Sequence, residues 1–500
     1  MKKIAKFLIV LGMMGQLSSC DYLDIVPDER AQESDTWKTE GAVRGYLYSC
    51  YGYLPANRTF GNSYWLAEEL TAVTKELFTT FKYGYYSPVS LGFTSNTWST
   101  IWNGIHQCYM FQESLKQVSN EYVTDEMKKQ YLAESNFLIA YYHFLSMRSY
   151  GPTMIIRSVI DLETPISGFP ERSSIDEVVA FINEKLDEAM SEGGLPTTWS
   201  GKDYGRATRL AALALKSRVY LYAASPLYNG NTEMYADFRS PLDGRQLIAQ
   251  EKSQAKWEIS ATQTKYAIDE VEKAKFHLYH DADAGEPSDA KPGLPNKAQR
   301  RLRYTNIDNQ TGNNPEIIWA DTRNDDYYGI QRRCPPRQTL GGKFAGISMT
   351  NCPTLQTIEA FYTKNGLPIN KDKTFDYDER YEYISAPENC DGNNYEDLVK
   401  YANFTPSSDK VMRLCTDREP RFYAWTTYHN GYFEFGKYNN EEISADPAKR
   451  AIRIHLLRDD PHGRGNRTDQ EYSISGFGNK KGVVPSAEWN VIEYPFPLFR

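Results

Sequence analysis

The sequence predicts a mainly α protein in which packed helix pairs are followed by a loop-rich, irregular second half containing short strands. Apolar residues recur at helix spacing in successive segments up to about residue 280. Small and bulky residues alternate along these segments, which favours close helix packing in a tetratricopeptide-like scaffold, although the strict period of about 34 residues is absent. From about residue 281 onward Pro, Gly, Asn and Asp become frequent, as is typical of functional surface loops.

The first residues have the pattern of a lipoprotein export signal. Three lysines precede an apolar run too short to span a bilayer, and Leu17–Cys20 follows with the sequence Leu-Ser-Ser-Cys. This tetrapeptide resembles a bacterial lipobox, so residues 1–19 are predicted to be a signal peptide and Cys20 the acylated N-terminus. Each buried methylene adds about 0.8 kcal/mol of membrane affinity, so acyl chains such as palmitate would anchor the protein durably. Residues 20–34 then form a lipidated tether. The alternative is an ordinary secretory signal that happens to contain Cys20.

Six segments between residues 35 and 280 have the periodicity of amphipathic helices. The first two, Glu40–Leu54 and Thr97–Val118, each carry one apolar face. The third, Glu126–Tyr150, carries an apolar row with an aromatic stripe beside it, and Gly151-Pro152 ends it.

The other three helical segments have clear boundary signals or faces. Ser174–Met190 begins with a capping box of Ser174 and Glu177. Thr208–Ala224 has a face of small residues, which lets a neighbouring helix approach closely, and a Ser-Pro pair ends it. Trp257–Phe276 completes the helical region of residues 35–280.

Residues 281–500 are predicted to be a loop-rich region with short regular pieces. Ile317–Trp319 has the composition of a strand, and Thr354–Tyr362 that of an isolated helical turn. Two loop cysteine pairs are open as disulfides: Cys334 with Cys352, and Cys390 with Cys415. Cys50 and Cys108 lie in helical segments and are predicted to be small core residues.

Composition and motifs exclude several classes of function. Without the three lysines of the signal, 54 basic residues face 65 acidic ones, so nucleic acid is not expected as a partner. No metalloprotease, nucleophile-elbow or phosphate-loop motif is present, and we expect no enzyme, no cofactor and no metal ion. His277 and His280 could bind a metal, but a surface pair at a helix end is favoured. Asp281 and Asp283 begin like a calcium loop whose later positions do not match. The remaining enzyme alternative is a glycosidase, whose two catalytic carboxylates lie about 5–10 Å apart and could come from any part of the sequence.

Two aromatic loops are the candidate ligand-binding surfaces. Sugars bind to exposed aromatic rings combined with planar polar side chains, and tyrosine offers both a flat apolar face and a polar edge. The candidate residues are Glu76, Tyr83, Tyr85, Tyr86, Asn324, Asp326, Tyr327, Tyr328 and Arg332. The alternative for each tyrosine is that it covers the core. Other prominent side chains are expected to be structural: Trp98, Trp102, Trp319, Arg206 and Arg218.

Segments along nearly the whole chain, in the same order, resemble the SusD/RagB family of outer-membrane nutrient-binding lipoproteins. They are Cys20–Asp24 with Pro27, Trp98–Leu115, Tyr131–Pro152, Gly205–Thr208 leading into Ala211–Tyr222, Asn314–Trp319, Pro353–Phe361 with Gly366, Arg418–Phe422 and Tyr494–Arg500. In the family the last segment leads into further helices. The sequence ends at Arg500, so we expect a C-terminal truncation that exposes apolar surface.

The resemblance implies a tetratricopeptide-like scaffold with a loop-rich ligand face. It also implies a lipid-anchored outer-membrane protein that faces the cell exterior and sits on a SusC-like TonB-dependent transporter. Such a protein captures a glycan or oligosaccharide and delivers it for import without changing it chemically. The alternatives are a peptide-binding member of the same family and a helical-repeat scaffold that binds only protein.

Overall fold

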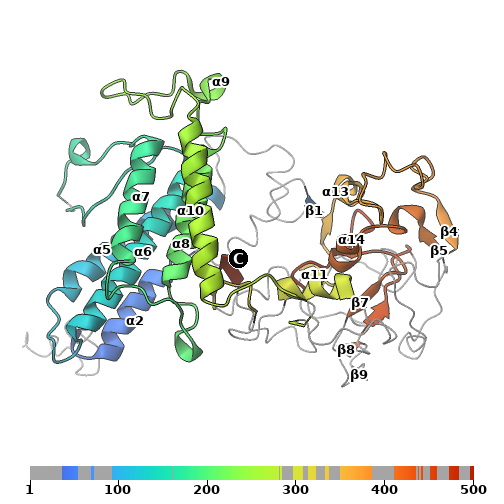
Figure 1. Ribbon diagram of the computed structural model, residues 1–500, viewed down its shortest axis with the longest axis horizontal. Coiled ribbons are helices and arrows are strands. Elements are labelled where there is room, and N and C mark those ends of the chain that lie inside the picture. Colours follow the sequence, from blue (N-terminus) through green and yellow to red (C-terminus); the bar gives the residue numbers. More distant parts are fainter. Residues whose placement is uncertain are drawn as a thin grey trace, which may run out of the picture.

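The structure is a computed structural model that describes residues 37–54, 69–72, 93–161, 163–280, 282–283, 297–307, 314–322, 333–336, 349–385, 410–434, 437–438, 441–442, 451–458, 472–483 and 496–499. Figure 1 shows the long helices at one end of the molecule and most of the later short helices and strands at the other. The prediction of a mainly α protein is confirmed. The predicted signal peptide, tether and lipidated Cys20 lie outside the described residues, and the predicted division near residue 280 stays a prediction.

The helical part is an array in which each long helix packs on the next one. Contacts join α2 to α5, α5 to α6, α6 to α7, α7 to α8 and α8 to α10. The single-turn helix α9 (Thr232–Tyr235) falls between α8 and α10 in the sequence. All six predicted helices are confirmed, with ends shifted by a few residues. Their bounds are α2 (Glu40–Tyr51), α5 (Phe93–Leu115), α6 (Asp125–Tyr150), α7 (Ile175–Ala189), α8 (Arg209–Ala224) and α10 (Gln254–Lys273).

Helix α6 is the centre of this array because it contacts α2, α5, α7 and α8. Its residues Phe137–Met147 are buried without interruption, as expected for a helix that is apolar all round. The polar side chains among them have local partners. His143 Nδ1 lies 2.7 Å from the Ile139 carbonyl oxygen, and the hydroxyls of Ser146 and Thr153 are 2.7 Å apart.

A groove of about 510 Å³ lies between α8 and α10. Its lining is mostly apolar, and Leu221, Ile268 and Leu278 remain exposed along it. Arg218 also lines the groove, and burial lowers the pKa of its guanidinium. The described residues therefore include a sizeable apolar surface beside α8 and α10.

The described strands form antiparallel pairs rather than a continuous sheet. The pairs are β1 (Leu70–Ala72) with β3 (Asn351–Pro353), β2 (Trp319–Asp321) with β12 (Phe496–Phe499), β4 (Tyr383–Ser385) with β5 (Lys410–Met412), β6 (Thr426–Thr427) with β11 (Gly478–Asn479), β7 (Tyr432–Glu434) with β10 (Ala451–Arg453), and β8 (Lys437–Tyr438) with β9 (Glu441–Glu442). Two of the pairs, β1 with β3 and β2 with β12, connect segments that are far apart in the sequence.

The second part has its own core beside the short helices α13 (Leu355–Ala360) and α14 (Pro420–Trp425). A third short helix, α11 (Lys297–Ile307), packs against α14. Arg418 is buried in this core and donates to the carbonyls of Leu414, Ile358 and Phe361 at 2.6, 2.8 and 2.7 Å. Burial lowers the pKa of Arg418 to about 10. A positive group at the end of α13 satisfies helix carbonyls that have no partner within the helix.

The described cysteines test one of the two possible disulfides, Cys334 with Cys352. Cys50 and Cys108 are buried thiols in α2 and α5, as predicted. Cys352 is also a thiol, with its Sγ 3.5 Å from the Thr71 carbonyl oxygen, so the possible Cys334–Cys352 bridge is not formed. Cys390 lies outside the described residues. Among the described helices, none combines the length and the apolar character needed to cross a membrane.

Candidate ligand-binding site

The nine predicted ligand residues fall in residues 73–92 and 323–332, outside the described part of the chain. Strand β1 directly precedes residues 73–92, and β2 is separated from residues 323–332 by one residue. The contacts of these two strands therefore fix where each of the two stretches begins.

The first anchor joins β1 to the second part of the molecule. Leu70 pairs with Pro353 and Ala72 with Asn351. The carbonyl of Glu69 accepts hydrogen bonds from the Thr354 N–H at 3.0 Å and the Thr357 hydroxyl at 2.9 Å. The chain that leads into residues 73–92 is thus fixed at the N-terminal end of α13, which lies more than 280 residues later in the sequence.

The second anchor is Trp319 in β2. Its indole N–H donates to the Gly205 carbonyl at 2.8 Å. Its ring meets the rings of Phe137 and Tyr141 on α6 edge-on, with centroid distances of 4.9 and 5.4 Å. Trp319 is buried, as predicted, so it fixes the chain that leads into residues 323–332 to the centre of the helical array.

Gly205 has to be glycine for this second anchor to form. Its φ is +98°, a conformation that side chains rarely adopt. A Cβ there would also approach the Thr322 Cγ2 to 2.7 Å. The close approach of the two segments therefore depends on the missing side chain.

A buried ion pair lies next to this anchor and joins three parts of the helical array. Arg206 Nη2 is 2.5 Å from Glu134 Oε1 on α6, and its Nη1 is 2.8 Å from Asp203 Oδ1. The Tyr51 hydroxyl on α2 donates to Glu134 at 2.6 Å and accepts from the Ala207 N–H at 2.9 Å. The guanidinium carbon of Arg206 lies 4.1 Å from the ring centroid of Trp199. The structural role expected for Arg206 is confirmed.

Burial dominates the electrostatics of this cluster. It raises the pKa of Glu134, against the opposing effect of the hydrogen bond and the charge of Arg206. Burial and the Glu134 carboxylate together raise the pKa of Tyr51 well above its usual value. The cluster is enclosed, so it positions the scaffold and does not offer groups to a ligand.

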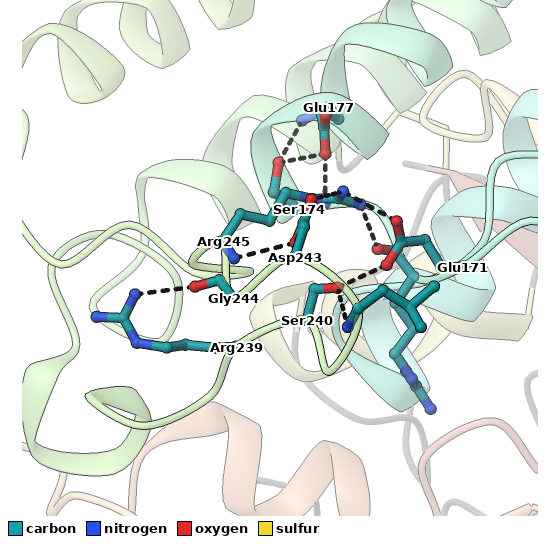
Figure 2. Close-up of polar contacts among 10 residues, drawn as sticks. Glu171, Ser174, Glu177, Arg239, Ser240, Asp243, Gly244 and Arg245 are labelled. Carbon is teal, nitrogen blue, oxygen red and sulfur yellow. Dashed lines mark hydrogen bonds and ion pairs between the residues drawn. The ribbon is translucent and has the colours of Figure 1, made fainter.

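A further polar cluster joins two loops at one end of the helical array (Figure 2). One loop precedes α7 and the other lies between α9 and α10, and we call them the clamped loops. Glu171, just before α7, accepts from the Ser240 hydroxyl at 2.6 Å and pairs with Arg245 at 3.1 Å. Arg245 also pairs with Asp243 at 2.6 Å. The predicted capping box lies beside them, where Ser174 and Glu177 bond to each other at 2.7 and 3.3 Å.

The clamped loops and the adjoining helix α9 carry exposed apolar side chains. Ile166 is 92% exposed and Leu242 is 77% exposed, and Phe169 and Met234 are also exposed. A contiguous patch of exposed apolar side chains is typical of protein contact surfaces.

The other expected side chains and alternatives are placed as follows. Trp98 and Trp102 are partly buried in α5, with ring centroids 5.4 Å apart, and Trp102 packs against the core. The rings of His277 and His280 stack at 5.2 Å in the chain after α10. Among the described residues, no group of three His, Cys, Asp or Glu side chains is arranged to hold a metal ion.

The structure also shows an exposed tyrosine cluster that the sequence reasoning missed. It lies at residues 377–383, beside α13, and includes Arg380 and Glu359. The available signal was the alternation of tyrosine with charged residues in Tyr-Asp-Glu-Arg-Tyr-Glu-Tyr. This pattern combines aromatic rings with planar polar side chains, which is the combination used to select the two predicted ligand-binding loops.

Comparisons with known proteins agree with this architecture. One family model, described as "Starch-binding associating with outer membrane", matches residues 21–221, and a second, described as the SusD family, matches residues 315–500. No curated protein matches the sequence.

Solved structures share the fold. The protein named BT4246 has a TM-score of 0.74 at 26% identity, covering 92% of this chain and 77% of that one. A SusD-like protein from Bacteroides fragilis has a TM-score of 0.61 at 19% identity, covering 94% and 74%. A SusD-like carbohydrate-binding protein from the same organism has a TM-score of 0.55 at 16% identity, covering 93% and 72%. The helix scaffold and these matches define a SusD-like protein, and the chain belongs to the SusD/RagB family.

Proposed function

We propose that the protein is an outer-membrane lipoprotein that binds a nutrient glycan and delivers it to a SusC-like TonB-dependent transporter. The observation that carries this proposal is the pair of family matches, one of them described as starch-binding and outer-membrane-associated. The solved SusD-like relative named as carbohydrate-binding supports the same ligand class. The ligand is bound and released unchanged, because proteins of this family are binding proteins.

The glycan contacts the loops of residues 73–92 and 323–332 through the nine side chains named from the sequence. Support comes from the anchors beneath them: β1 is fixed at α13, and β2 is fixed at α6 by Trp319. A rigid support lowers the entropy cost of ordering loop side chains around a ligand. The two loops then contribute tyrosine rings and planar polar groups to one binding surface.

The protein is held at the membrane by acyl chains on Cys20 and faces the cell exterior. The 16 residues between Cys20 and Trp37 can reach up to about 50–58 Å when extended. The clamped loops with Ile166 and Leu242 offer a contact surface to the transporter.

Calorimetry tests glycan binding directly. The protein is titrated with a panel of neutral polysaccharides and their oligosaccharides, together with Y85A and Y327A variants and Y122A as a control on the helical part. Wild type should bind at least one glycan, and each loop variant should weaken binding about tenfold, as expected for the loss of an aromatic anchor. Y122A should bind as wild type does. Failure of wild type to bind any glycan at millimolar concentration would overturn the proposal.

Mass spectrometry of the protein isolated from membranes tests the anchor. We expect an N-terminal Cys20 carrying acyl chains, and C20S should abolish membrane retention. An unmodified residue 20 contradicts this part of the proposal.

A further inference from the structure

We propose that the surface formed by the exposed Tyr381 and Tyr383, together with the partly buried Tyr377, Arg380 and Glu359, is a second carbohydrate-binding surface, which takes a neutral oligosaccharide. We call it the Tyr381 platform. It rests on the proposed function for the ligand class, and its residues come from α13, β4 and the chain just before β4, not from the two predicted ligand-binding segments.

The platform is built around one guanidinium. The Cζ of Arg380 lies 4.0 Å from the ring centroid of Tyr377 and 4.5 Å from that of Tyr381. Its Nε pairs with Glu359 Oε1 at 2.8 Å, and the Tyr381 hydroxyl donates to the same oxygen. Ring, cation and carboxylate therefore hold one another in place.

The backbone beneath the platform is also fixed. The Arg380 Nη1 donates to the Tyr377 carbonyl at 2.9 Å. The Leu414 N–H donates to the Arg380 carbonyl at 2.7 Å, and the Arg413 N–H donates to the Glu382 carbonyl at 2.9 Å. Glu359 belongs to α13, whose end is held by the buried Arg418. A surface fixed in this way loses little side-chain entropy when a ligand binds.

Two rings of the platform remain open to a ligand. Tyr381 and Tyr383 are each 43% exposed. They are two residues apart, so their Cα atoms are separated by at most about 7.6 Å, and one short oligosaccharide can contact both.

The charges favour a neutral ligand. Arg380 pairs with Glu359, and the neighbouring Arg413 pairs with Glu379 at 3.0 Å. The same segment also carries the exposed Asp376, Asp378 and Glu382, so the surface has an acidic excess, which repels anionic ligands but not a neutral sugar. It still presents guanidinium N–H donors, carboxylate acceptors and ring faces, which match the hydroxyls and C–H faces of a sugar.

The test compares wild type with the Y381A/Y383A double variant. The probes are gluco-, manno-, galacto- and xylo-oligosaccharides of two to eight residues and their parent polysaccharides, measured by calorimetry and by affinity electrophoresis. The double variant should weaken binding of the longest chains that wild type binds by about tenfold. Y122A, which removes a tyrosine 38% exposed on the helical part, should change the affinity less than twofold.

Two further variants and an exchange measurement separate binding from folding. Y383A alone leaves the Arg380–Glu359–Tyr381 contacts intact and should weaken binding in the same direction. Y381F keeps the ring and should retain most of the affinity. Hydrogen exchange at residues 376–385 should slow when the longest bound oligosaccharide is added to wild type.

The outcomes distinguish this inference from the proposed function. If wild type binds a glycan and both Y381A/Y383A and Y383A bind it equally well, the Tyr381 platform is wrong and the proposed function stands. Unchanged exchange at residues 376–385 in the saturated complex also overturns the platform. If wild type binds no glycan, both proposals fail. Weaker binding that is confined to the platform variants supports the inference.

Discussion

Arg206 and Glu134 form an ion pair inside the helical array, although 72 residues separate them in the chain. The Glu134 side chain is fully buried and that of Arg206 is nearly so. Loss of one partner would leave the other charge buried without compensation, which typically costs about 3–5 kcal/mol. This relationship leads to the first prediction.

We expect R206L to lower the free energy of unfolding by about 3–5 kcal/mol, measured by urea denaturation followed by circular dichroism. The control is K116M, which removes a pair with Glu113 of 2.8 Å whose side chains are 58% and 56% exposed. That change should cost less than about 1 kcal/mol. Equal effects of the two substitutions would contradict the structural role of the buried pair.

The second prediction concerns Gly205, which combines a positive φ with a close approach to Thr322. G205A should destabilise the protein by more than G151A, because Gly151 also has a positive φ, of +73°, but its Cβ position is open. The backbone strain alone is about 1–2 kcal/mol. Adding T322A should recover the excess cost of G205A and none of the cost of G151A. Denaturation of wild type, G205A, G151A, T322A and the two double variants gives the coupling energy for each glycine.

The third prediction is a pH dependence that comes from His143. Burial lowers the pKa of His143 to about 4, from about 6.5 in the unfolded chain. The unfolded state therefore binds the proton first as the pH falls, so stability contributed by neutral His143 is present above pH 6.5 and is lost progressively down to pH 4. The full effect is about 3 kcal/mol.

Urea denaturation of wild type and H143Q at pH 7 and pH 4.5 measures this contribution. Carboxylates titrate in both proteins, so the difference between them isolates the histidine. H143Q should lose less stability than wild type between the two pH values. A parallel loss in both proteins rules out the proposed titration.

The fourth prediction concerns the groove between α8 and α10. A groove of this volume with apolar walls should bind an anionic naphthalene dye, with a rise in fluorescence. L221E places a charge beside the groove, at a side chain 50% exposed, and should reduce the dye signal without lowering stability. The control is M234E, which alters an exposed apolar side chain on α9, away from the groove lining. It should leave the groove signal unchanged.

Local signals in the sequence identified the helices because each one carries its own periodicity and caps. The capping box of Ser174 and Glu177 and the buried face of α2 are examples in which all the information lies within a few residues. Helix ends were less accurate: α5 begins at Phe93 instead of Thr97, because fraying ends carry weaker patterns.

The contacts that build the candidate site have no comparable local signal. Trp319 was expected to be buried, but nothing near it indicates Gly205 or Phe137 as its partner. The Tyr381 platform depends on Glu359, which is 22 residues away and on another element. Such pairings are decided by how elements pack, so a single sequence specifies the residue types and leaves the partners open.

The pairing of Leu70 with Pro353 has a consequence for the covalent continuity of the protein. A short piece of the N-terminal chain is built into the far end of the molecule, so a single peptide-bond break between the two halves leaves the fragments attached to each other. The pairing also closes a loop of more than 280 residues, which makes it a slow, late contact during synthesis. Residues 35–280 produced alone would carry a strand whose partner is missing.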